Sequence, residues 1–146
     1  MVRLLISCVI LFAAIFLVNS QQFLEDCGPC DRSKCPVTFS CESGIVKDRC
    51  GCCDVCAKKE YELCDHPQVR TPEGVFNGKC GEHLECRLRN DLGAGDPREA
   101  VCVCTMDETL CGSDGVTYDN ICQLGAAGVR KNEKITVRNK GPCRAG

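Results

Sequence analysis

Cysteine is the residue that most limits what this chain can fold into. The sequence of 146 residues contains 17 cysteines and no tryptophan, and cysteine above about 8–10% of a short chain is typical of a disulfide scaffold. The remaining apolar residues are too sparse after residue 20 to offset the entropy of ordering the backbone, about 1–2 kcal/mol per residue. We therefore predict a small, loop-rich protein that is held together by disulfide bonds.

The first twenty residues have the pattern of a secretory signal peptide. A short basic start ends at Arg3, and the apolar run Leu4–Val18 is followed by small and polar residues. This run is shorter than the ~20 residues that a membrane-spanning helix needs. We predict that residues 1–20 are removed after Ser20 and that the protein is secreted to the extracellular space. Cys8 leaves with this segment, so an even set of sixteen cysteines remains.

Several chemistries that the cysteines or charges suggest are disfavoured. Cys27-Gly28-Pro29-Cys30 matches a thioredoxin motif, but it lacks the βαβ frame that presents a low-pKa thiolate. Cys53 and Cys56 have zinc-ligand spacing, but the secretory route favours disulfides. No catalytic array or phosphate loop stands out, and a net charge of −2 gives no reason to expect nucleic acid. We expect no metal, no cofactor and no enzyme activity.

Secondary structure is predicted to be sparse. Asp114-Gly115 before a β-prone run indicates a hairpin, and a short helix is expected over Ile121–Lys131, capped by Asp119 or Asn120. The polar stretch 89–98 indicates an exposed loop. Short strands are predicted at Gly44–Lys47, Gly74–Phe76, Ala100–Cys104 and Ile135–Val137.

The run from Cys50 to Ala57 (CGCCDVCA) resembles the signature of the insulin-like growth factor-binding protein N-terminal domain. That family carries twelve cysteines, and Cys27 through Cys102 supply twelve in the same order. Arg49 departs from the pattern, because the growth-factor binders usually have glycine before Cys-Gly-Cys-Cys. The resemblance implies a ladder-like, cysteine-knot-like domain with short β-strands over residues 21–103.

The run from Cys111 to Cys122 (CGSDGVTYDNIC) resembles a Kazal domain. Four of the six usual cysteines are present, so twelve and four account for all sixteen. We expect a small α+β Kazal-like domain over residues 104–146. The tandem resembles the N-terminal half of insulin-like growth factor-binding-protein-related proteins. Since the chain ends three residues after Cys143, we expect neither a third module nor a protease domain.

The two resemblances also imply a disulfide pairing, whereas spacing alone leaves about two million pairings open. The implied pairs are Cys27–Cys50, Cys30–Cys52, Cys35–Cys53, Cys41–Cys56, Cys64–Cys86, Cys80–Cys102, Cys104–Cys122 and Cys111–Cys143. A link between Cys102 and Cys122 would overturn the domain boundary.

The favoured function is binding of an insulin-like growth factor or a related peptide hormone, which would modulate its signalling. Val75 and Phe76 match the apolar pair with which the family contacts the hormone. Exposed apolar residues on a rigid frame suit an interaction site, although packing against the disulfides is the alternative role. Further candidate contacts are Leu84, Leu88, Phe23 and Leu24.

Serine protease inhibition is the first alternative function. In inhibitory Kazal domains the specificity residue lies two positions after the second cysteine, which here is Met106 in the loop Thr105–Asp107. Asn120 matches the asparagine that braces this loop by hydrogen bonds. However, the interval Cys104–Cys111 is one residue short and one flanking disulfide is missing, so the loop loses preorganisation.

Binding to the extracellular matrix through heparin or another glycosaminoglycan is the second alternative. The C-terminal stretch contains six basic residues and one acidic residue, Glu133. An ordinary solvated surface explains the same pattern. The basic residues are Arg130, Lys131, Lys134, Arg138, Lys140 and Arg144.

Overall fold

The structure is a computed structural model that describes residues 27–72 and 74–144. Contacts divide the chain into two units, Met1–Arg32 and Ser33–Gly146. Within the second unit we distinguish an N-terminal region (residues 33–104) and a C-terminal region (residues 105–144). The predicted signal peptide lies outside the described residues, and so do Phe23 and Leu24.

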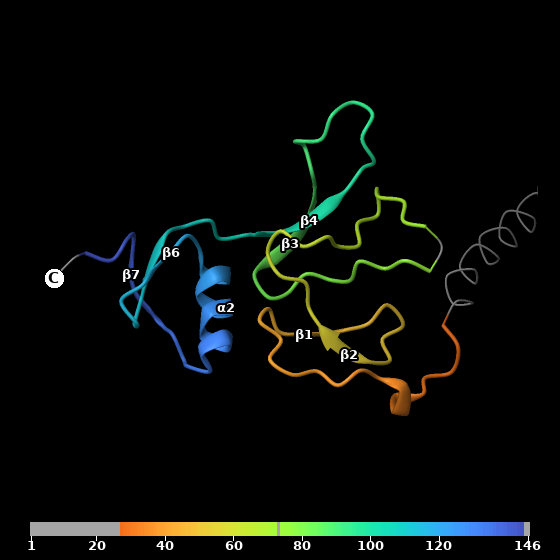
Figure 1. Cartoon of the computed structure of the whole chain (residues 1–146), viewed down its shortest axis with the longest axis horizontal. Helices are drawn as coiled ribbons and strands as arrows, with labels where there is room; N and C mark the ends of the chain where they lie inside the picture. The colour runs from red at the N-terminus through yellow and green to blue at the C-terminus, as the bar shows by residue number, and fades with distance from the viewer. Residues whose placement is uncertain (1–26, 73, 145–146) are drawn as a thin grey trace, which may run out of the picture. The chain divides into compact units, whose positions relative to one another are not determined.

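The described chain folds into short strands, one 3-10 turn and one α-helix, which confirms the predicted disulfide-rich class. The elements in chain order are η1 (Arg32–Lys34), β1 (Ile45–Lys47), β2 (Asp54–Cys56), β3 (Leu84–Leu88), β4 (Ala100–Cys104), β5 (Leu110–Gly112), β6 (Thr117–Tyr118), α2 (Ile121–Lys131) and β7 (Val137–Lys140), most of them labelled in Figure 1. The strands form antiparallel pairs β1–β2 and β3–β4 and a three-stranded antiparallel sheet in the order β6–β5–β7.

Disulfides replace a conventional core in the N-terminal region. All sixteen cysteines from Cys27 to Cys143 are disulfide-bonded. The described pairs are Cys35–Cys53, Cys41–Cys56, Cys64–Cys86, Cys80–Cys102, Cys104–Cys122 and Cys111–Cys143. These six coincide with pairs that the family resemblance implies. For Cys27, Cys30, Cys50 and Cys52 the partners remain a prediction.

The interior of the N-terminal region lies beneath the β3–β4 pair. Cys64, Ala100 and Cys102 are each at most 1% exposed, and the partly buried Leu84 and Leu88 pack against them. Because side chains alternate along a strand, Ala100, Cys102 and Cys104 of β4 are buried, whereas the two valines between them are only half-buried. Cystine sulfur therefore fills much of this small interior.

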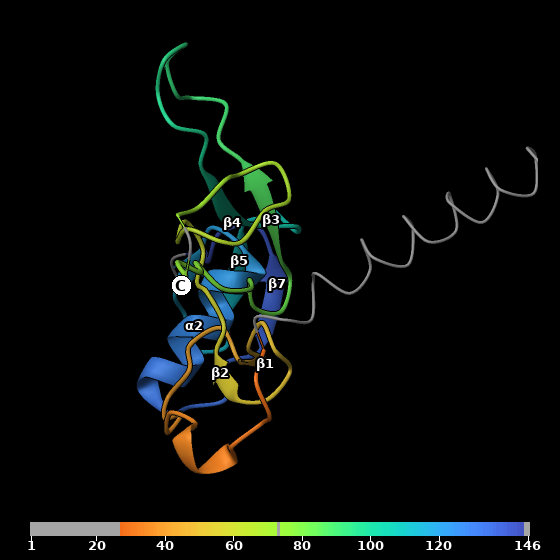
Figure 2. The same cartoon turned by 90° about the vertical axis from the view of Figure 1, so that its right-hand side faces the viewer.

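The loop between β3 and β4 extends away from the two strands in both views (Figures 1 and 2). Residues 93–98 within it are exposed, as the sequence predicts. At its base Arg89 donates hydrogen bonds to the carboxylates of Asp91, at 2.7 and 3.1 Å, and of Glu99, at 2.8 Å. The loop is thus closed by ion pairs and by the strand pairing below it.

The C-terminal region has a small apolar core. Leu110, Tyr118, Leu124 and Ala127 are buried, and Ile121 and Ile135 pack against them. The helix has the predicted bounds Ile121–Lys131. The hairpin is also confirmed, since β5 pairs with β6 across a turn in which Gly115 has φ +78°, a conformation that glycine adopts without strain. Among the described residues, no helix is long and apolar enough to cross a membrane.

Two strand predictions are wrong. Gly74–Phe76 forms a turn and irregular chain. Gly74 has φ +76°, and the two amides after Phe76 donate hydrogen bonds to a side chain instead of to a neighbouring strand. The strand expected at Ile135–Val137 runs instead over Val137–Lys140, since Ile135 turns into the apolar core. Strands β2 and β3 are additional to those predicted. Each of them forms through its pairing with a strand that was predicted, β1 or β4.

Candidate functional site

The loop that carries Val75 and Phe76 is held in one shape by Asp65. The carboxylate of Asp65 accepts hydrogen bonds from the backbone amides of Asn77 at 2.8 Å and Gly78 at 3.1 Å, and its own amide donates to the Gly78 carbonyl at 2.9 Å. The Val75 amide donates to the carbonyl of Pro72 at 3.0 Å and closes a turn. Backbone amides at Val75 and directly after Phe76 are therefore hydrogen-bonded.

Val75 and Phe76 remain half open to solvent. Their exposed fractions are 46% and 50%. The guanidinium carbon of Arg49 lies 4.2 Å from the centre of the Phe76 ring, which is within cation–π distance. Nearby, Lys79 Nζ donates to the carbonyl of Asp48 at 3.3 Å. The loop therefore presents a half-exposed apolar pair, with an arginine stacked on its aromatic ring.

The other candidate hormone contacts lie differently. Leu84 and Leu88 point from β3 toward the cystine-rich interior and are half-buried. Their positions support a packing role, and only their outer parts remain for a ligand. The structure thus brings Val75 and Phe76 together at the surface and places Leu84 and Leu88 mainly in the interior.

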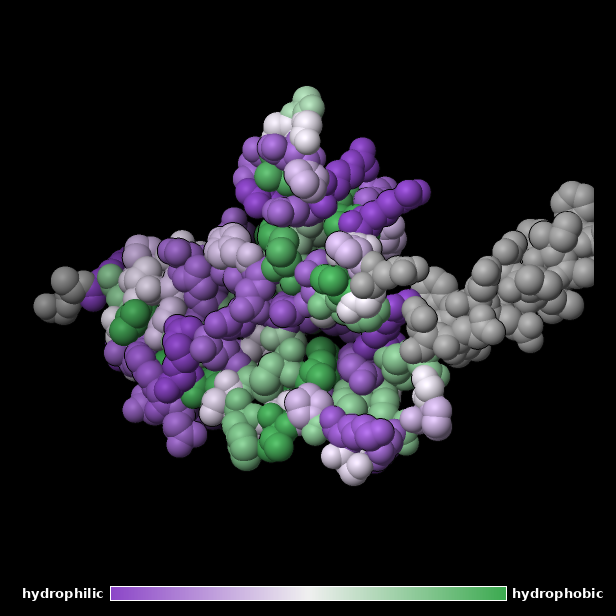
Figure 3. All heavy atoms as spheres, turned by 45° about the vertical axis from the view of Figure 1, so that its right-hand side comes forward, coloured by the Kyte–Doolittle hydropathy of each residue, from purple (hydrophilic) through white to green (hydrophobic). Residues whose placement is uncertain are grey.

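Sequence reasoning missed the most exposed large apolar residues. Val37, Phe39 and Tyr61 are 78%, 82% and 69% exposed, and Ile45 is 56% exposed. Figure 3 shows hydrophobic residues at the surface, bordered by hydrophilic ones. The signal available in the sequence is the Pro-Val-Thr-Phe run between Cys35 and Cys41, which lies in a segment with no other apolar elements to bury it.

The candidate protease-binding loop follows β4 directly. The Thr105 backbone amide and hydroxyl both donate to the carbonyl of His83, at 2.8 and 3.0 Å. Met106 and Asp107 are exposed, and the exposed fraction of Met106 is 45%. The start of the loop is therefore fixed, while Met106, the predicted specificity residue, is exposed to solvent.

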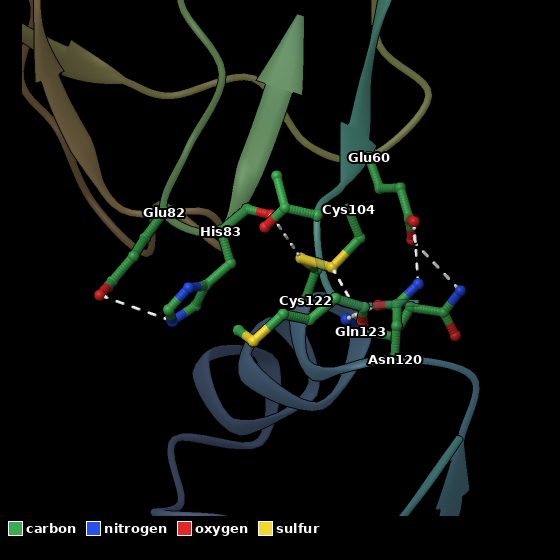
Figure 4. The surroundings of a disulfide bond; sticks show 9 residues. Glu60, Glu82, His83, Cys104, Asn120, Cys122 and Gln123 are labelled. Carbon is green, nitrogen blue, oxygen red and sulfur yellow. Dashed lines mark hydrogen bonds and ion pairs between the residues drawn. A yellow bond between two sulfur atoms is a disulfide. The ribbon is translucent and has the colours of Figure 1, made fainter. Parts of the chain in front are cut away.

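Asn120 is engaged away from that loop. It is 2% exposed, and its Oδ1 accepts from the Gln123 amide at 2.9 Å, which caps α2. Its Nδ2 donates to Glu60 Oε1 at 2.9 Å, and Gln123 Nε2 donates to Glu60 Oε2 at 3.3 Å (Figure 4). Neither hydrogen bond described for the Asn120 side chain reaches residues 105–109.

Half of the basic residues near the C-terminus are ion-paired. Arg130 pairs with Glu42 at 2.8 Å, Lys131 with Asp114 at 2.7 Å and Lys140 with Glu108 at 2.9 Å. Hydrogen bonds from Lys131 and then Tyr118 lower the pKa of Asp114 to about 2. The positive charge of this C-terminal stretch is thus partly neutralised by acidic residues elsewhere in the chain.

The remaining basic residues include a group around a shallow hollow. Arg138, Lys140 and Arg144 line a hollow of about 720 Å³ beside β7, together with Cys111 and residues 139–143. Among the described residues no acidic side chain lines it, although Glu108 pairs with Lys140. This group is the part of the basic stretch that could hold an anion.

In the described part of the chain, two groups of cysteines have sulfur atoms close enough together to suggest metal binding. One group is Cys35, Cys52 and Cys53, and the other is Cys64, Cys80 and Cys102. All six are disulfide-bonded, whereas the species that binds a metal is the thiolate. These sulfur atoms therefore act as cross-links.

The described residues form a disulfide frame that presents exposed apolar side chains and an exposed loop between cysteines. Residues 27–86 match the family model described as insulin-like growth factor binding protein, and residues 99–143 match the Kazal-type serine protease inhibitor domain. The chain carries a domain of the first family followed by a domain of the second.

Several known proteins are similar to most of this chain. Insulin-like growth factor-binding protein-related protein 1 of Cupiennius salei is 50% identical over 82% of the chain and 46% of its own length. Kazal-type serine protease inhibitor domain-containing protein 1 of Homo sapiens is 45% identical over 84% of the chain and 40% of its own length. Serine protease HTRA1B of Danio rerio is 35% identical over 99% of the chain and 32% of its own length. The chain therefore spans less than half the length of each of these relatives.

Proposed function

We propose that this chain is a secreted, non-enzymatic protein that binds an insulin-like growth factor or a related peptide hormone and modulates its signalling. The carrying observation is the half-exposed pair Val75–Phe76 on a loop clamped by Asp65. The family match over residues 27–86 supports the choice of ligand. The proposal includes removal of residues 1–20 and domains over 21–103 and 104–146.

The exposed pair has the properties of a binding hot spot. A fully buried valine or phenylalanine side chain contributes about 1.5–3 kcal/mol, and about half of each side chain is still exposed here. Burying the remainder under a hormone would therefore contribute on the order of 1–3 kcal/mol. Because the loop is already ordered, little of this gain is lost in fixing the backbone on binding.

The direct test is calorimetry of the mature protein with insulin-like growth factors 1 and 2 and with insulin. We expect saturable binding to at least one of these peptides. Val75→Ala should weaken binding, whereas Val116→Ala should not, because Val116 has a similar exposed fraction of 43% but lies in the C-terminal region. Absence of binding to all three peptides would contradict the proposal.

Serine protease inhibition is a second candidate, favoured by the Kazal match and by the exposure of Met106. The hydrogen bonds of Asn120 to Glu60 and Gln123 count against it, because they leave this side chain engaged outside residues 105–109. Titration against chymotrypsin-like, elastase-like and subtilisin-like proteases distinguishes the outcomes. Stoichiometric inhibition that Met106→Asp abolishes would establish it, and cleavage without inhibition would refute it.

A sulfated glycan such as heparin is a third candidate partner, supported by the hollow that Arg138, Lys140 and Arg144 line. We expect Arg138→Gln with Arg144→Gln to lower the salt concentration that elutes the protein from heparin. Lys134→Gln is the matched control, since this lysine is outside the hollow. Equal elution of all variants at low salt would leave an ordinary solvated surface.

A further inference from the structure

Tyr61 is an exposed tyrosine on a strained turn of the N-terminal region. Its exposed fraction is 69%, and its backbone has φ +67°, a conformation that glycine adopts readily and a bulky residue rarely does. The turn is held on both sides, because the Tyr61 amide donates to the Cys102 carbonyl at 2.8 Å and the Glu62 amide donates to the Lys59 carbonyl at 3.1 Å. A strained backbone that its surroundings maintain indicates a role for the side chain that it displays.

The hydroxyl of Tyr61 lies in an acidic environment. Glu60 and Glu62 flank the tyrosine in the sequence. The charge of Glu60 above all, then partial burial, and then the charges of Asp107 and Asp119 raise the pKa of the Tyr61 hydroxyl above its ordinary value. Asp107 and Asp119 belong to the C-terminal region, so the tertiary fold adds negative charge to the acidic residues beside Tyr61 in the sequence.

The two flanking glutamates keep their negative charge. The carboxylate of Glu60 accepts hydrogen bonds from Asn120 Nδ2 at 2.9 Å and from Gln123 Nε2 at 3.3 Å. Glu62 Oε2 accepts from the Lys59 backbone amide at 2.8 Å. All three donors are uncharged amides, so these contacts leave the negative charge beside Tyr61 in place.

The two lysines that precede Glu60 in the sequence extend toward other groups. Lys59 Nζ lies 3.9 Å from Glu42 Oε2. The side chain of Lys58 lies so close to Gly78 that a Cβ at that glycine would meet Lys58 Cε at 3.1 Å. The charges that act on the Tyr61 hydroxyl are therefore mainly those of the carboxylates.

The other tyrosine of the chain provides a natural comparison. The sequence contains two tyrosines, and Tyr118 is buried in the C-terminal core with an exposed fraction of 7%. Its hydroxyl donates a hydrogen bond to Asp114 Oδ2 at 2.7 Å. An enzyme that modifies tyrosine hydroxyls on the folded protein can therefore reach Tyr61 but not Tyr118.

We propose that Tyr61 is a tyrosine sulfation site that is modified while the chain is secreted. A transferase that binds a nucleotide phosphosulfate as donor needs a basic cleft, and acidic residues beside the acceptor hydroxyl are attracted to such a cleft. The inference rests on the proposed secretion of the chain but not on hormone binding.

The reaction is a group transfer in which nothing is oxidised or reduced. The phenol oxygen of Tyr61 forms a bond to the sulfur of the phosphosulfate, and the bond from that sulfur to the bridging phosphate oxygen breaks. The nucleotide leaves with the bridging oxygen, and a base of the transferase takes the phenol proton. Tyr61 thereby gains one SO3 group in place of its proton and carries a lasting negative charge.

The test is accurate mass analysis of the protein that cultured animal cells secrete, with and without chlorate, which blocks synthesis of the phosphosulfate donor. Tyr61→Phe removes the acceptor, and Tyr118→Phe is the matched control. Glu62→Gln combined with Asp107→Asn removes two acidic groups and leaves Glu60 unchanged. Non-reducing mass analysis verifies the disulfides of each variant, and a reporter with a known sulfated tyrosine verifies that the cells are competent.

We expect the secreted wild-type protein to carry one SO3 group that is absent after chlorate treatment and in Tyr61→Phe. Tyr118→Phe should keep this group, and the variant that lacks two acidic groups should carry it on an about fivefold smaller fraction of chains. If the reporter is sulfated and the wild-type protein is not, or if the added group is a phosphate or lies on Tyr118, the inference is wrong and the proposed function stands. If the chain is not secreted, both are overturned.

Discussion

The two regions of this protein build their small interiors from different kinds of residue. In the N-terminal region the buried residues are mainly cystines, with Cys64 and Cys102 fully buried around Ala100. In the C-terminal region the interior is built from side chains such as Leu110 and Leu124. The difference shows how cross-linking releases apolar residues from the interior, because a disulfide frame does not depend on them for its stability.

The distribution of exposed apolar residues follows from this difference. Val37, Phe39, Val75 and Phe76 in the N-terminal region are between 46% and 82% exposed. In the C-terminal region no large apolar side chain of the described residues is more than 45% exposed. The apolar surface best suited to binding a partner therefore lies on the region with the most disulfides.

The largest effect is expected from removing a buried disulfide of the N-terminal region. Replacing both Cys64 and Cys86 with alanine opens a link of sequence separation 22 and empties part of the interior. Loss of a native disulfide in a small secreted domain costs about 2–5 kcal/mol of unfolding free energy. Guanidinium denaturation of the oxidised protein measures the loss.

Replacing Cys35 and Cys53 is the matched comparison, since this pair is only partly buried. This replacement should lower the free energy of unfolding by less than the change at Cys64 and Cys86. Equal losses for the two pairs would show that sulfur does not act as a core in the N-terminal region.

The C-terminal region should instead be sensitive to a single apolar truncation. Leu124 in α2 is 4% exposed, so Leu124→Ala should lower the free energy of unfolding by about 2–4 kcal/mol through lost burial and a cavity. Val129→Ala in the same helix is the control, because Val129 is 39% exposed. Hydrogen exchange of the α2 amides reports the effect, and similar exchange in both variants would contradict a side-chain core.

A smaller effect is expected where α2 begins. Asn120→Ala removes the helix cap and leaves Glu60 without its hydrogen bond from Nδ2, and loss of such a cap costs about 0.5–2 kcal/mol. Asn120→Asp keeps an acceptor for the Gln123 amide but places a carboxylate beside Glu60. Thermal unfolding should rank the wild type above both variants. A wild-type melting temperature for Asn120→Asp would show that the bond to Glu60 contributes nothing.

The smallest effect concerns acid. Hydrogen bonds from Lys131 and Tyr118 hold the pKa of Asp114 at about 2, below its ordinary 3.8. A lowered folded-state pKa means that the contribution to stability is present above about pH 4 and is lost as the pH falls toward 2. Asp114→Asn should flatten the acid dependence of stability of the C-terminal region. If the pH dependence of stability is unchanged in this variant, Asp114 does not contribute to it.

Local signals in the sequence predict local structure well. Asp114-Gly115 marks the hairpin, and Asn120 marks the start of a helix that ends where expected, at Lys131. Residue order alone does not reveal that Asp65 binds the amides of Asn77 and Gly78. This contact across twelve residues makes a loop where the composition of Gly74–Phe76 favours a strand.

The candidate sites show the same division. The exposed pair Val75–Phe76 can be proposed from the family pattern, but its contact with Arg49 depends on how two distant turns meet. The role of Asn120 is likewise set by Glu60, sixty positions earlier in the chain. Neither partner has a local signal, because both contacts are created by the tertiary fold.

The most direct test of the account is the affinity of the double variant Val75→Ala, Phe76→Ala for whichever insulin-like peptide binds the wild-type protein most tightly. Calorimetry should show at least a tenfold loss, which corresponds to about 1.4 kcal/mol, while non-reducing mass analysis shows the same disulfides as the wild type. An affinity within twofold of the wild type in a correctly cross-linked variant would contradict the claim that the disulfide frame leaves this apolar pair free to bind a hormone.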